Sequence, residues 1–424
     1  MPNFYNIYFL IIFYFLKLNQ YVYLQLSPLS PEIEYTNFIK STYGRNLSKF
    51  ALEIGLLNFD SNFTDFINKY QKQYQSDEVE YRKGNFLYSF NLVHHTNKDF
   101  DRGRLAYRLS LNRFSDYGLN DNYFISQKYV NPTYIAKLGA SSLRLNGDDD
   151  FEEDATTTWP LQSVRSKIMK QFPMNWDWRT KGVVSQVKDQ GNCGSCWIFA
   201  ALSVIESAHA IIKNPLIPLS EQYIMNCVKP PKYVSDGCAG GTVDDVYSFV
   251  QNSGAIQEFA FPYFGKPIGT CPNTTGFWKE TISKYTFLPI NSTDRHIMWA
   301  LYNKGPLAAV INAGDKQFEL YSGGILTTPG NRDLFTDQNH YITIVGWGHE
   351  NGYDYWLIKN SWGTDWGDGG FAKLLRGINN RGINSIVSYV EAGSQMVDSE
   401  ACSIHLITFN TWIFIFINWI ILLL

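Results

Sequence analysis

Apolar side chains recur with helical spacing in the segment that follows residue 60. Phe63, Phe66, Ile67 and Tyr70 lie at i, i+3, i+4 and i+7, so they share one face of a predicted helix. The alternation of apolar and polar residues over 109–116 predicts a short strand. A second helix, crossing the first, is predicted by a set of residues that recur at steps of three or four: Glu78, Arg82, Phe86, Ser89, Val93 and Asn97.

Further along the chain, the pattern changes from helical to strand-like. An apolar run that starts at Cys196 predicts a helix to about residue 212, and short strands with glycine turns follow residue 305. Two of these strands cover residues 341–345 and 355–358. The order of elements predicts an α+β fold, with a helical half followed by a strand-rich half.

Both ends of the chain are apolar. Residues 7–16 have the length of a signal-peptide core, so we interpret residues 1–26 as a secretory signal, with a buried helix as the alternative. Residues 404–424 are long enough to cross a bilayer. Small residues up to Ser394 and a polar spacer precede them, which is the order of a GPI-attachment signal. A tail anchor and a buried helix are the alternatives for residues 394–424.

Charge and composition argue against a nucleic-acid partner. The 36 basic and 39 acidic residues give a net charge of -3, and no dense basic stretch is present in the sequence. The acidic run at 148–154 predicts a flexible linker over residues 131–171, which is also a suitable place for proteolytic maturation.

Entry into the secretory pathway would affect two other features. The six cysteines are then expected to form mostly disulfides. Four sequons would become glycan acceptors: Asn46, Asn62, Asn273 and Asn291.

Two cysteines, Cys193 and Cys196, lie three positions apart in a Gly-rich loop. A thioredoxin-like redox pair would need a βαβ pattern, which is missing around Cys193. A zinc site would need two more ligands at close spacing, but Cys227 and Cys238 are separated and have no flanking histidine. The third interpretation, one structural cysteine beside one nucleophile, fits the context.

Cys196 is the better candidate for the nucleophile. It lies in the first turn of the predicted helix, where oriented N–H groups and the helix dipole lower the pKa of a thiol. Gln190, on the same loop, can bring its side-chain amide beside the backbone N–H of Cys196. The two groups would then supply two donors for an oxyanion.

The nucleophile needs a base from elsewhere in the chain and a group that orients this base. His209 lies inside the predicted helix, and His296 falls in a predicted loop without an orienting partner. His340 precedes one predicted strand, and Asn360 follows the next. Antiparallel pairing of these strands would place Asn360 beside His340.

At this point the sequence resembles a known family. Residues 193–197 match the signature C-G-[SA]-C-[WY], and residues 339–340 and 360–363 extend the match to papain and the cathepsin L-like cysteine proteases. The resemblance covers about residues 62–392. It implies a papain-like fold of two subdomains with an active-site cleft between them, over residues 172–393.

The resemblance also implies the roles of individual residues. Cys196 would be the nucleophile of a cysteine endopeptidase and His340 its base. Asn360 would hold the imidazole, Gln190 would complete the oxyanion hole, and Trp362 would shield the hydrogen bond between His340 and Asn360. No cofactor or metal is expected, and the protein is expected to be a monomer.

Two disulfides are implied by the same comparison, and a third bridge of the family is missing. The positions of the missing bridge fall near Pro329 and Arg381, and Cys402 is left unpaired. The implied pairs are Cys193 with Cys238 and Cys227 with Cys271.

Residues 60–130 resemble the inhibitory propiece of these enzymes. Asn112, Phe114 and Asp116 match its shorter motif. Its longer motif is matched by five residues of the second predicted helix: Glu78, Arg82, Phe86, Val93 and Asn97. The chain is therefore expected to be a zymogen whose own propeptide inhibits it until it is removed. A secreted, lysosomal or vacuolar location follows, with possible attachment to a membrane through the tail.

Substrate contacts follow from the comparison as well. Gly240 and Gly241 would bind the extended peptide backbone, and protein or peptide substrates with Leu, Val or Phe two residues before the cut are expected. Tyr341 departs from the family, which usually has a small residue there, and it could narrow the leaving-group side of the site or shift His340. The residues expected to line the second subsite are Thr242, Val243, Val310 and Ile386.

Two other functional classes compete with this hypothesis. A catalytically silent family member would bind peptides or a partner without cleaving them. A transglutaminase-type enzyme shares the cysteine and histidine but uses an aspartate in place of Asn360.

Overall fold

The computed structural model describes seven ranges of the chain: residues 31–42, 44–118, 121, 172–212, 214–330, 338–394 and 396–397. The predicted signal, the whole predicted linker and nearly all of the hydrophobic tail lie outside the described residues. Contacts divide the chain into two units, one ending at Tyr88 and the other beginning at Ser89. No helix among the described residues is both long enough and apolar enough to cross a membrane.

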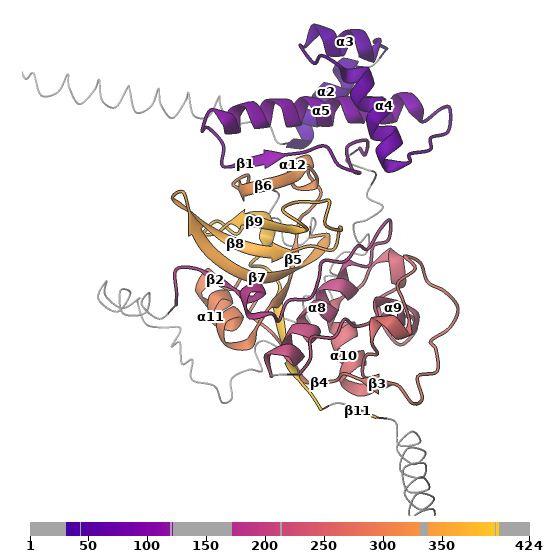
Figure 1. Cartoon of the computed structure of the whole chain (residues 1–424), viewed down its shortest axis with the longest axis vertical. Helices are drawn as coiled ribbons and strands as arrows, with labels where there is room; N and C mark the ends of the chain where they lie inside the picture. Colours follow the sequence, from indigo (N-terminus) through magenta and orange to yellow (C-terminus); the bar gives the residue numbers. More distant parts are fainter. Residues whose placement is uncertain are drawn as a thin grey trace, which may run out of the picture. The chain divides into compact units, whose positions relative to one another are not determined.

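The first unit is helical (Figure 1). Contacts between aromatic rings hold its helices together. The predicted apolar face of α4 is present, with Phe63 and Phe66 buried. The Phe86 ring lies 5.2 Å from that of Phe63 and 4.8 Å from that of Phe66. The two predicted helices are thus confirmed. The helices are α2 (Pro31–Thr42), α3 (Leu47–Glu53), α4 (Phe59–Tyr70) and the first part of α5 (Val79–Asp101).

The strand predicted over residues 109–116 is wrong. The observed strand, β1 (Tyr107–Leu109), is shorter and earlier, and turns follow it. The side chain of Asn112 accepts a hydrogen bond from Phe114 N at 3.0 Å, and Ser115 Oγ accepts one from Asn112 N at 2.9 Å. Such local side-chain bonds compete with a strand ladder, and the alternation of polarity does not reveal them.

The second unit contains a sheet of nine strands in which β7 pairs with β5, β8 and β2. The two predicted strands are present as β7 and β8, both longer than expected, and they pair antiparallel. The strands of this sheet, besides β1, are β2 (Trp176–Asp177), β4 (Ile282–Phe287), β5 (Leu307–Ile311), β6 (Tyr321–Leu326), β7 (His340–Glu350), β8 (Tyr353–Lys359), β9 (Phe371–Leu375) and β10 (Val387–Ala392). A separate two-stranded sheet pairs β3 (Trp278–Lys279) with β11 (Met396–Val397).

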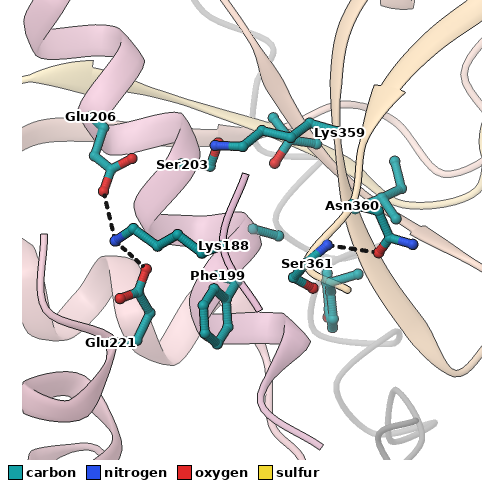
Figure 2. A pocket seen from close by; sticks show the side chains of 12 residues that line it. Lys188, Phe199, Ser203, Glu206, Glu221, Lys359, Asn360 and Ser361 are labelled. Carbon is teal, nitrogen blue, oxygen red and sulfur yellow. Dashed lines mark hydrogen bonds and ion pairs between the residues drawn. The ribbon is translucent and has the colours of Figure 1, made fainter. Parts of the chain in front are cut away.

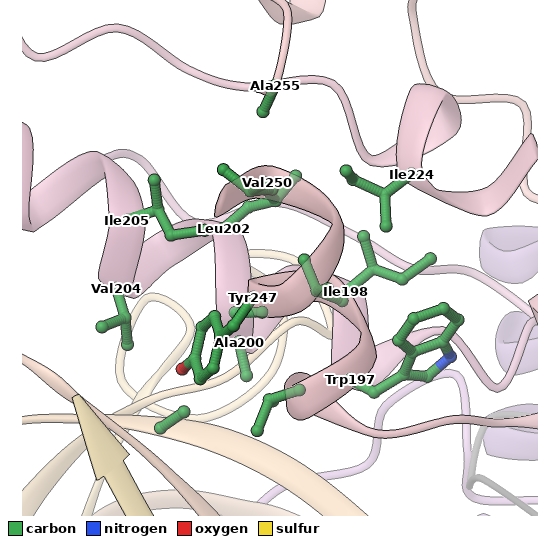
Figure 3. Packing of buried hydrophobic residues seen from close by; sticks show 14 of the residues in the cluster. Trp197, Ile198, Ala200, Leu202, Val204, Ile205, Ile224, Tyr247, Val250 and Ala255 are labelled. Carbon is green, nitrogen blue, oxygen red and sulfur yellow. The ribbon is translucent and has the colours of Figure 1, made fainter. Parts of the chain in front are cut away.

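The helical half of this unit is built around α8 (Cys196–Ile211), as the apolar run predicts. Almost every side chain of α8 is buried, because α9 (Glu221–Cys227), α10 (Val243–Ser253) and the strands β7 and β10 surround it. Figure 3 shows this packing, with Tyr247 and Val250 of α10 beside residues of α8.

A second core lies within the strand-rich half and includes buried tryptophans at positions 347, 356, 362 and 366. The loop predicted around His296 is wrong, since this residue lies in α11 (Asp294–Lys304). Thr293 caps this helix by accepting a hydrogen bond from His296 N at 3.3 Å. The run of small polar residues is therefore a helix start.

Both implied disulfides are present, Cys193 with Cys238 and Cys227 with Cys271. Among the described residues, Cys196 is the cysteine that forms no disulfide.

The position of the missing third bridge contains a buried ion pair. Arg381 N donates to Pro329 O at 2.7 Å, so the two positions named by the comparison are indeed adjacent. The Arg381 guanidinium bonds the carboxylate of Asp315, with Nη2 3.0 Å from Oδ1, and lies over the ring of Phe318. The ion pair with Asp315, a residue of another segment, thus fixes Arg381 where the family has a covalent link.

Candidate active site

The loop before α8 positions Cys196 at the first residue of the helix, where it is fully buried. The first N–H groups of a helix have no acceptor within the helix, so they can interact with a negative charge at this end. The disulfide of Cys193 and a hydrogen bond from Gly194 N to Cys238 O at 3.1 Å fix the loop from one side.

Tyr263 fixes this loop from the other side. Its hydroxyl lies 2.7 Å from Ser195 Oγ and donates to Gln190 O at 2.9 Å. Burial raises the pKa of this phenol, so it remains protonated and can donate. The sequence offers no signal for this contact, because Tyr263 follows in a distant loop.

Gln190 connects the cysteine loop with the loop that follows β8. Its Nε2 donates to Cys193 O at 2.7 Å, and its Oε1 accepts from Ser361 Oγ at 2.6 Å. Gln190 N also donates to Ser361 O at 2.8 Å. Two of these contacts therefore fix the orientation of the side-chain amide, with its N–H groups on the side of the cysteine loop.

His340 and Asn360 are joined by a hydrogen bond, as predicted from the pairing of β7 with β8. His340 Nε2 lies 2.8 Å from Asn360 Oδ1, and Ser361 N donates to the same oxygen at 2.8 Å. Because a backbone N–H can only donate, the shared atom is an oxygen, and Nε2 must carry the proton. The lone pair of the neutral imidazole is therefore on Nδ1, which has no hydrogen-bond partner among the described residues.

Trp362 covers this pair, with its ring 4.8 Å from the imidazole. His340 is completely buried in the precursor. Burial lowers the pKa of His340 to about 4, and the hydrogen bond that its Nε2 donates to Asn360 opposes this shift. The closed precursor therefore favours a neutral imidazole.

The first residues of β7, at His340 and Tyr341, lie close to the start of α8. These two elements pack against each other, and the charge of Cys196 acts on the phenol of Tyr341, the residue after His340. The four residues predicted for catalysis, which are scattered from position 190 to 360, thus belong to two neighbouring loops, one helix end and one strand.

The Gly-Gly segment lies beside the cysteine loop. Gly240 has φ 110°, a conformation that favours glycine, and a Cβ atom on Gly241 would lie 2.4 Å from Ser235 Oγ and 2.7 Å from the Trp197 ring. The fold of the chain itself therefore requires a residue without a side chain at both positions.

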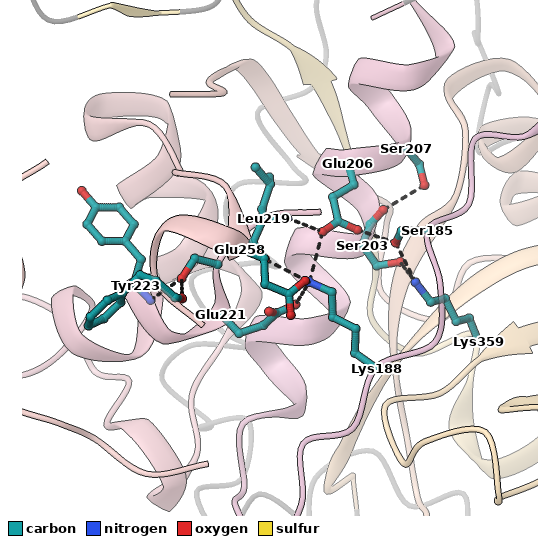
Figure 4. A network of polar contacts seen from close by, with 12 residues as sticks. Ser185, Lys188, Ser203, Glu206, Ser207, Leu219, Glu221, Tyr223, Glu258 and Lys359 are labelled. Atoms are coloured by element: carbon teal, nitrogen blue, oxygen red, sulfur yellow. Dashed lines mark hydrogen bonds and ion pairs between the residues drawn. The ribbon is translucent and has the colours of Figure 1, made fainter. Parts of the chain in front are cut away.

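A buried polar network lies behind the site, between α8 and the sheet (Figures 2 and 4). Lys188 Nζ lies 2.7 Å from Glu221 Oε1 and 3.6 Å from Glu206 Oε1. Lys359 Nζ, beside Asn360 in the chain, donates to Ser185 Oγ at 2.8 Å. Nothing in the sequence distinguishes these lysines and glutamates from ordinary surface charges, so the network could not be predicted from it.

The charged groups of this network shift the pKa values of one another. Burial alone would lower the pKa of Lys188, but the carboxylates of Glu206 and Glu221 outweigh it and raise the pKa. Burial raises the pKa of Glu221 to about 7 against the attraction of Lys188. Burial lowers the pKa of Lys359 to about 8. Within the described ranges, no cluster of three or more His, Cys, Asp or Glu side chains has the arrangement of a metal site.

Within the second unit, residues 106–116 bind to the strand-rich half. Strand β1 pairs antiparallel with β6, and Asn112 Nδ2 donates to Glu319 O at 2.8 Å. Lys316 Nζ donates to Phe114 O at 3.0 Å and pairs with the buried carboxylate of Glu319 at 2.6 Å. Burial raises the pKa of Glu319 to about 7, opposed by Lys316.

The same segment reaches the catalytic loops. The ring of Phe114 packs edge-on against that of Trp362 at 5.1 Å. The neighbouring Arg113 bonds both carboxylate oxygens of Asp189, the residue before Gln190, with Nη2 2.7 Å from Oδ1. The predicted propiece thus contacts the tryptophan over His340 and the loop of the predicted oxyanion hole.

A thiol at a helix N-terminus, next to a strand that carries an amide-bound imidazole, is the arrangement of a cysteine hydrolase. Comparisons with known proteins agree. A family model described as papain family cysteine protease matches residues 172–391, and one described as cathepsin propeptide inhibitor domain matches residues 63–121. The chain therefore belongs to the papain family of cysteine proteases and carries its own inhibitory propeptide.

Individual proteins that are similar to this chain are proteases as well. The chain is 31% identical to digestive cysteine proteinase 2 of Homarus americanus over 80% of its own length and 97% of that protein. It is 33% identical to cathepsin L1 of Drosophila melanogaster over 76% and 82%. The structure of a digestive procathepsin L2 proteinase from the larval midgut of Tenebrio molitor matches with a TM-score of 0.63 and 29% identity, covering 78% of this chain and 99% of that one.

Proposed function

We propose that the chain is the precursor of a cysteine endopeptidase in which Cys196 and His340 form a thiolate and imidazolium pair. The observation that carries the proposal is the hydrogen bond from His340 Nε2 to Asn360 Oδ1 beneath Trp362, which leaves Nδ1 of the imidazole for the thiol. Transfer of the thiol proton to Nδ1 gives the ion pair.

In the first half-reaction, the Cys196 thiolate attacks the carbonyl carbon of the peptide bond. The oxyanion that forms accepts hydrogen bonds from the backbone N–H of Cys196 and from Gln190 Nε2. The imidazolium of His340 then donates its Nδ1 proton to the amide nitrogen, the C–N bond breaks, and the amine leaves a thioester on Cys196.

Hydrolysis of the thioester completes the cycle. Neutral His340 accepts a proton from water through Nδ1 as the water oxygen attacks the thioester carbonyl. The C–S bond breaks, the carboxylic acid product leaves, and the thiolate and imidazolium are restored. Asn360 keeps the imidazole in the required orientation in both halves.

Apolar side chains of the helical and strand-rich halves support the proposed second subsite. Val243 begins α10, Val310 lies on β5, and Val310 N donates to Ile386 O at 3.2 Å. We expect an apolar residue two positions before the cut, because a charge buried there would be unpaired.

Activation and location belong to the same proposal. Cleavage in the linker at residues 131–171 would separate the propeptide, residues 60–130, from the peptidase domain. We propose that the protein enters the secretory pathway, which is consistent with its two disulfides. Attachment to a membrane through residues 394–424 stays a prediction that mass spectrometry of both ends of the mature chain would test.

The catalytic assignment is tested by labelling the matured protein with an epoxide that alkylates activated thiols. We expect one label per molecule, on Cys196, and loss of peptidase activity in proportion to labelling. His340→Gln should label far more slowly, and Cys196→Ser should not label. Correctly matured wild-type protein that takes up no label would instead be a catalytically silent peptide-binding protein.

A further inference from the structure

Two neighbouring aromatic side chains are exposed on the peptidase unit beside the strand pair β3 and β11. Phe277 is 38% exposed and Trp278 is 56% exposed. Trp278 lies in β3 and pairs with Val397 of β11. Neither aromatic side chain has a role in the proposed mechanism, and adjacent large apolar groups on a surface mark a site of interaction.

The chain leaves the described fold next to these aromatic residues. Gly393 N donates to Thr281 O at 2.9 Å, and Ser394 O accepts from Thr281 Oγ1 at 2.5 Å. The pairing of β11 with β3 then holds the backbone as far as Val397. The segment that continues towards the apolar residues 404–424 therefore starts opposite Trp278.

The length of that segment limits how far this surface can lie from a membrane. Only residues 398–403 separate β11 from the apolar run, which has the length of a membrane span. Even a fully extended chain covers at most about 25 Å between Val397 and residue 404. Insertion of residues 404–424 into a bilayer would therefore keep β3 and β11 within about 25 Å of its hydrocarbon core.

The exposed side chains have the chemistry of the membrane interface. The indole of tryptophan has an apolar ring and a polar N–H, and it is enriched where headgroups meet acyl chains. The phenylalanine ring gains from leaving water as well. A lipid surface that the tail brings this close would thus cover both Phe277 and Trp278 favourably.

The same surface lies at the opposite end of α8 from Cys196. His209, in the last turn of α8, donates from Nε2 to Thr281 O at 2.7 Å, and its Nδ1 lies 2.9 Å from Glu280 Oε2. Figure 1 shows β3, β4 and β11 together at this end of the unit. The rise of the helix from Cys196 to His209 is about 20 Å. Contact with a membrane here would leave the catalytic end of the helix away from the lipid.

We propose that Phe277 and Trp278 dock on the lipid surface of the membrane into which residues 404–424 insert. This inference rests on the membrane attachment suggested under the proposed function, and it selects insertion of the tail over its removal. Docking holds the enzyme in one orientation, with the active site facing the aqueous compartment. The substrates are then peptide segments outside the bilayer.

The experiment reads the contact from Trp278 itself. The full-length chain carries Cys196→Ala, which prevents self-cleavage, and is produced without N-glycans because Asn273 precedes β3 in the same loop. Trp412→Phe and Trp419→Phe remove the tryptophans of the tail. In phosphatidylcholine vesicles with brominated acyl chains, which quench tryptophan on contact, we expect fluorescence to fall. Adding Trp278→Phe should abolish this fall.

A matched pair of variants tests the patch. Phe277→Ser removes one of the two docking rings and should lower the ratio of docked to undocked protein by about tenfold, read as lost quenching of Trp278. Phe259 is 81% exposed, and the adjacent Glu258 pairs at 3.0 Å with Lys188 near the catalytic loops. Phe259→Ser should therefore leave the quenching unchanged.

The outcomes are distinct. Quenching of Trp412 and Trp419 in a chain that retains them, without quenching of Trp278, overturns the docking, because the tail then inserts alone. Absence of quenching in the tail overturns it as well. A Trp278 shielded from both brominated lipid and aqueous acrylamide is covered by protein, such as a second copy, which also contradicts lipid docking. No arm depends on catalysis, so the peptidase proposal is tested separately by epoxide labelling of the wild type.

Discussion

The tautomer and the orientation of the His340 imidazole depend on single side chains. Asn360 Oδ1 accepts from both the imidazole and Ser361 N, so one amide oxygen determines the tautomer of the base. Trp362 covers this hydrogen bond and excludes water from it. A hydrogen bond in such a setting is stronger than in water, and its loss affects orientation as well as protonation.

Replacing Asn360 with Ala should lower kcat/KM by about 10²-fold, because the imidazole loses the group that keeps its proton on Nε2. Asn360→Asp is the matched variant: it retains an acceptor for Nε2 and should recover part of the loss. Steady-state rates against pH would check this, since a purely structural role would lower the rate without moving the pH profile. Equal activities of wild type and Asn360→Ala would contradict the orienting role.

At the scale of elements, the segment around β1 is the connection between the propeptide and the active site. Its contacts with the peptidase are buried to different degrees, and we rank their contributions to binding by this burial. Phe114 is 1% exposed against Trp362, whereas the side chains of Arg113 and Asp189 are 28% and 40% exposed. An ion pair that exposed contributes about 0.2–1 kcal/mol, far less than a buried aromatic ring.

Phe114→Ala should therefore weaken autoinhibition strongly. A loss of about 3 kcal/mol corresponds to roughly a hundredfold shift towards the undocked propeptide. The rate at which the precursor is converted, or is labelled by the epoxide, measures this shift. Arg113→Ala serves as the comparison and should change the rate by a few-fold at most. Equal effects of the two variants would show that burial does not rank these contacts.

The buried ion pair of Arg381 and Asp315 connects two elements at the position of the missing bridge. Asp315→Ala would leave a buried, uncompensated guanidinium and should lower the free energy of unfolding by about 3–5 kcal/mol. The double variant Asp315→Ala with Arg381→Met removes the stranded charge and should recover much of that loss. Denaturant titrations of the mature enzyme compare the two, and a double variant no more stable than Asp315→Ala would contradict this account.

At the scale of the whole peptidase unit, the two halves meet across a polar network rather than a purely apolar core. Lys188 pairs with Glu206, Glu221 and Glu258 there, at distances from 2.7 to 3.6 Å. Removing one partner from such a network leaves uncompensated charge of the opposite sign. The resulting loss in the free energy of unfolding depends on pH, because the carboxylates can take up protons.

Lys188→Met should lower the melting temperature much more at pH 7.5 than at pH 4.5. The folded-state pKa of Glu221, already raised to about 7, rises further without Lys188. A carboxyl whose pKa is higher folded than unfolded binds more protons in the folded state, so the free energy of unfolding falls as pH rises above its unfolded pKa. Lys284→Met, at an exposed position, is the control. A loss that does not depend on pH would contradict this account.

Much of the site could be predicted from sequence because its motifs are local. Cys196 opens a helix whose apolar run is visible in the sequence, and the two strands that bring His340 to Asn360 follow one another directly. The failures have a local cause too. The strand predicted at 109–116 and the loop predicted at His296 are both wrong because side chains there accept hydrogen bonds from the nearby backbone and fix its conformation. A pattern of polarity does not contain these bonds.

The sequence by itself predicted the candidate catalytic residues, because their motifs depend on spacing along the chain, and its family resemblance predicted the disulfide pairs and the propeptide. Tertiary structure alone decided which buried charges pair and that Tyr263 fixes the cysteine loop. These features join residues far apart in sequence. Their energies depend on burial, which a linear pattern does not specify.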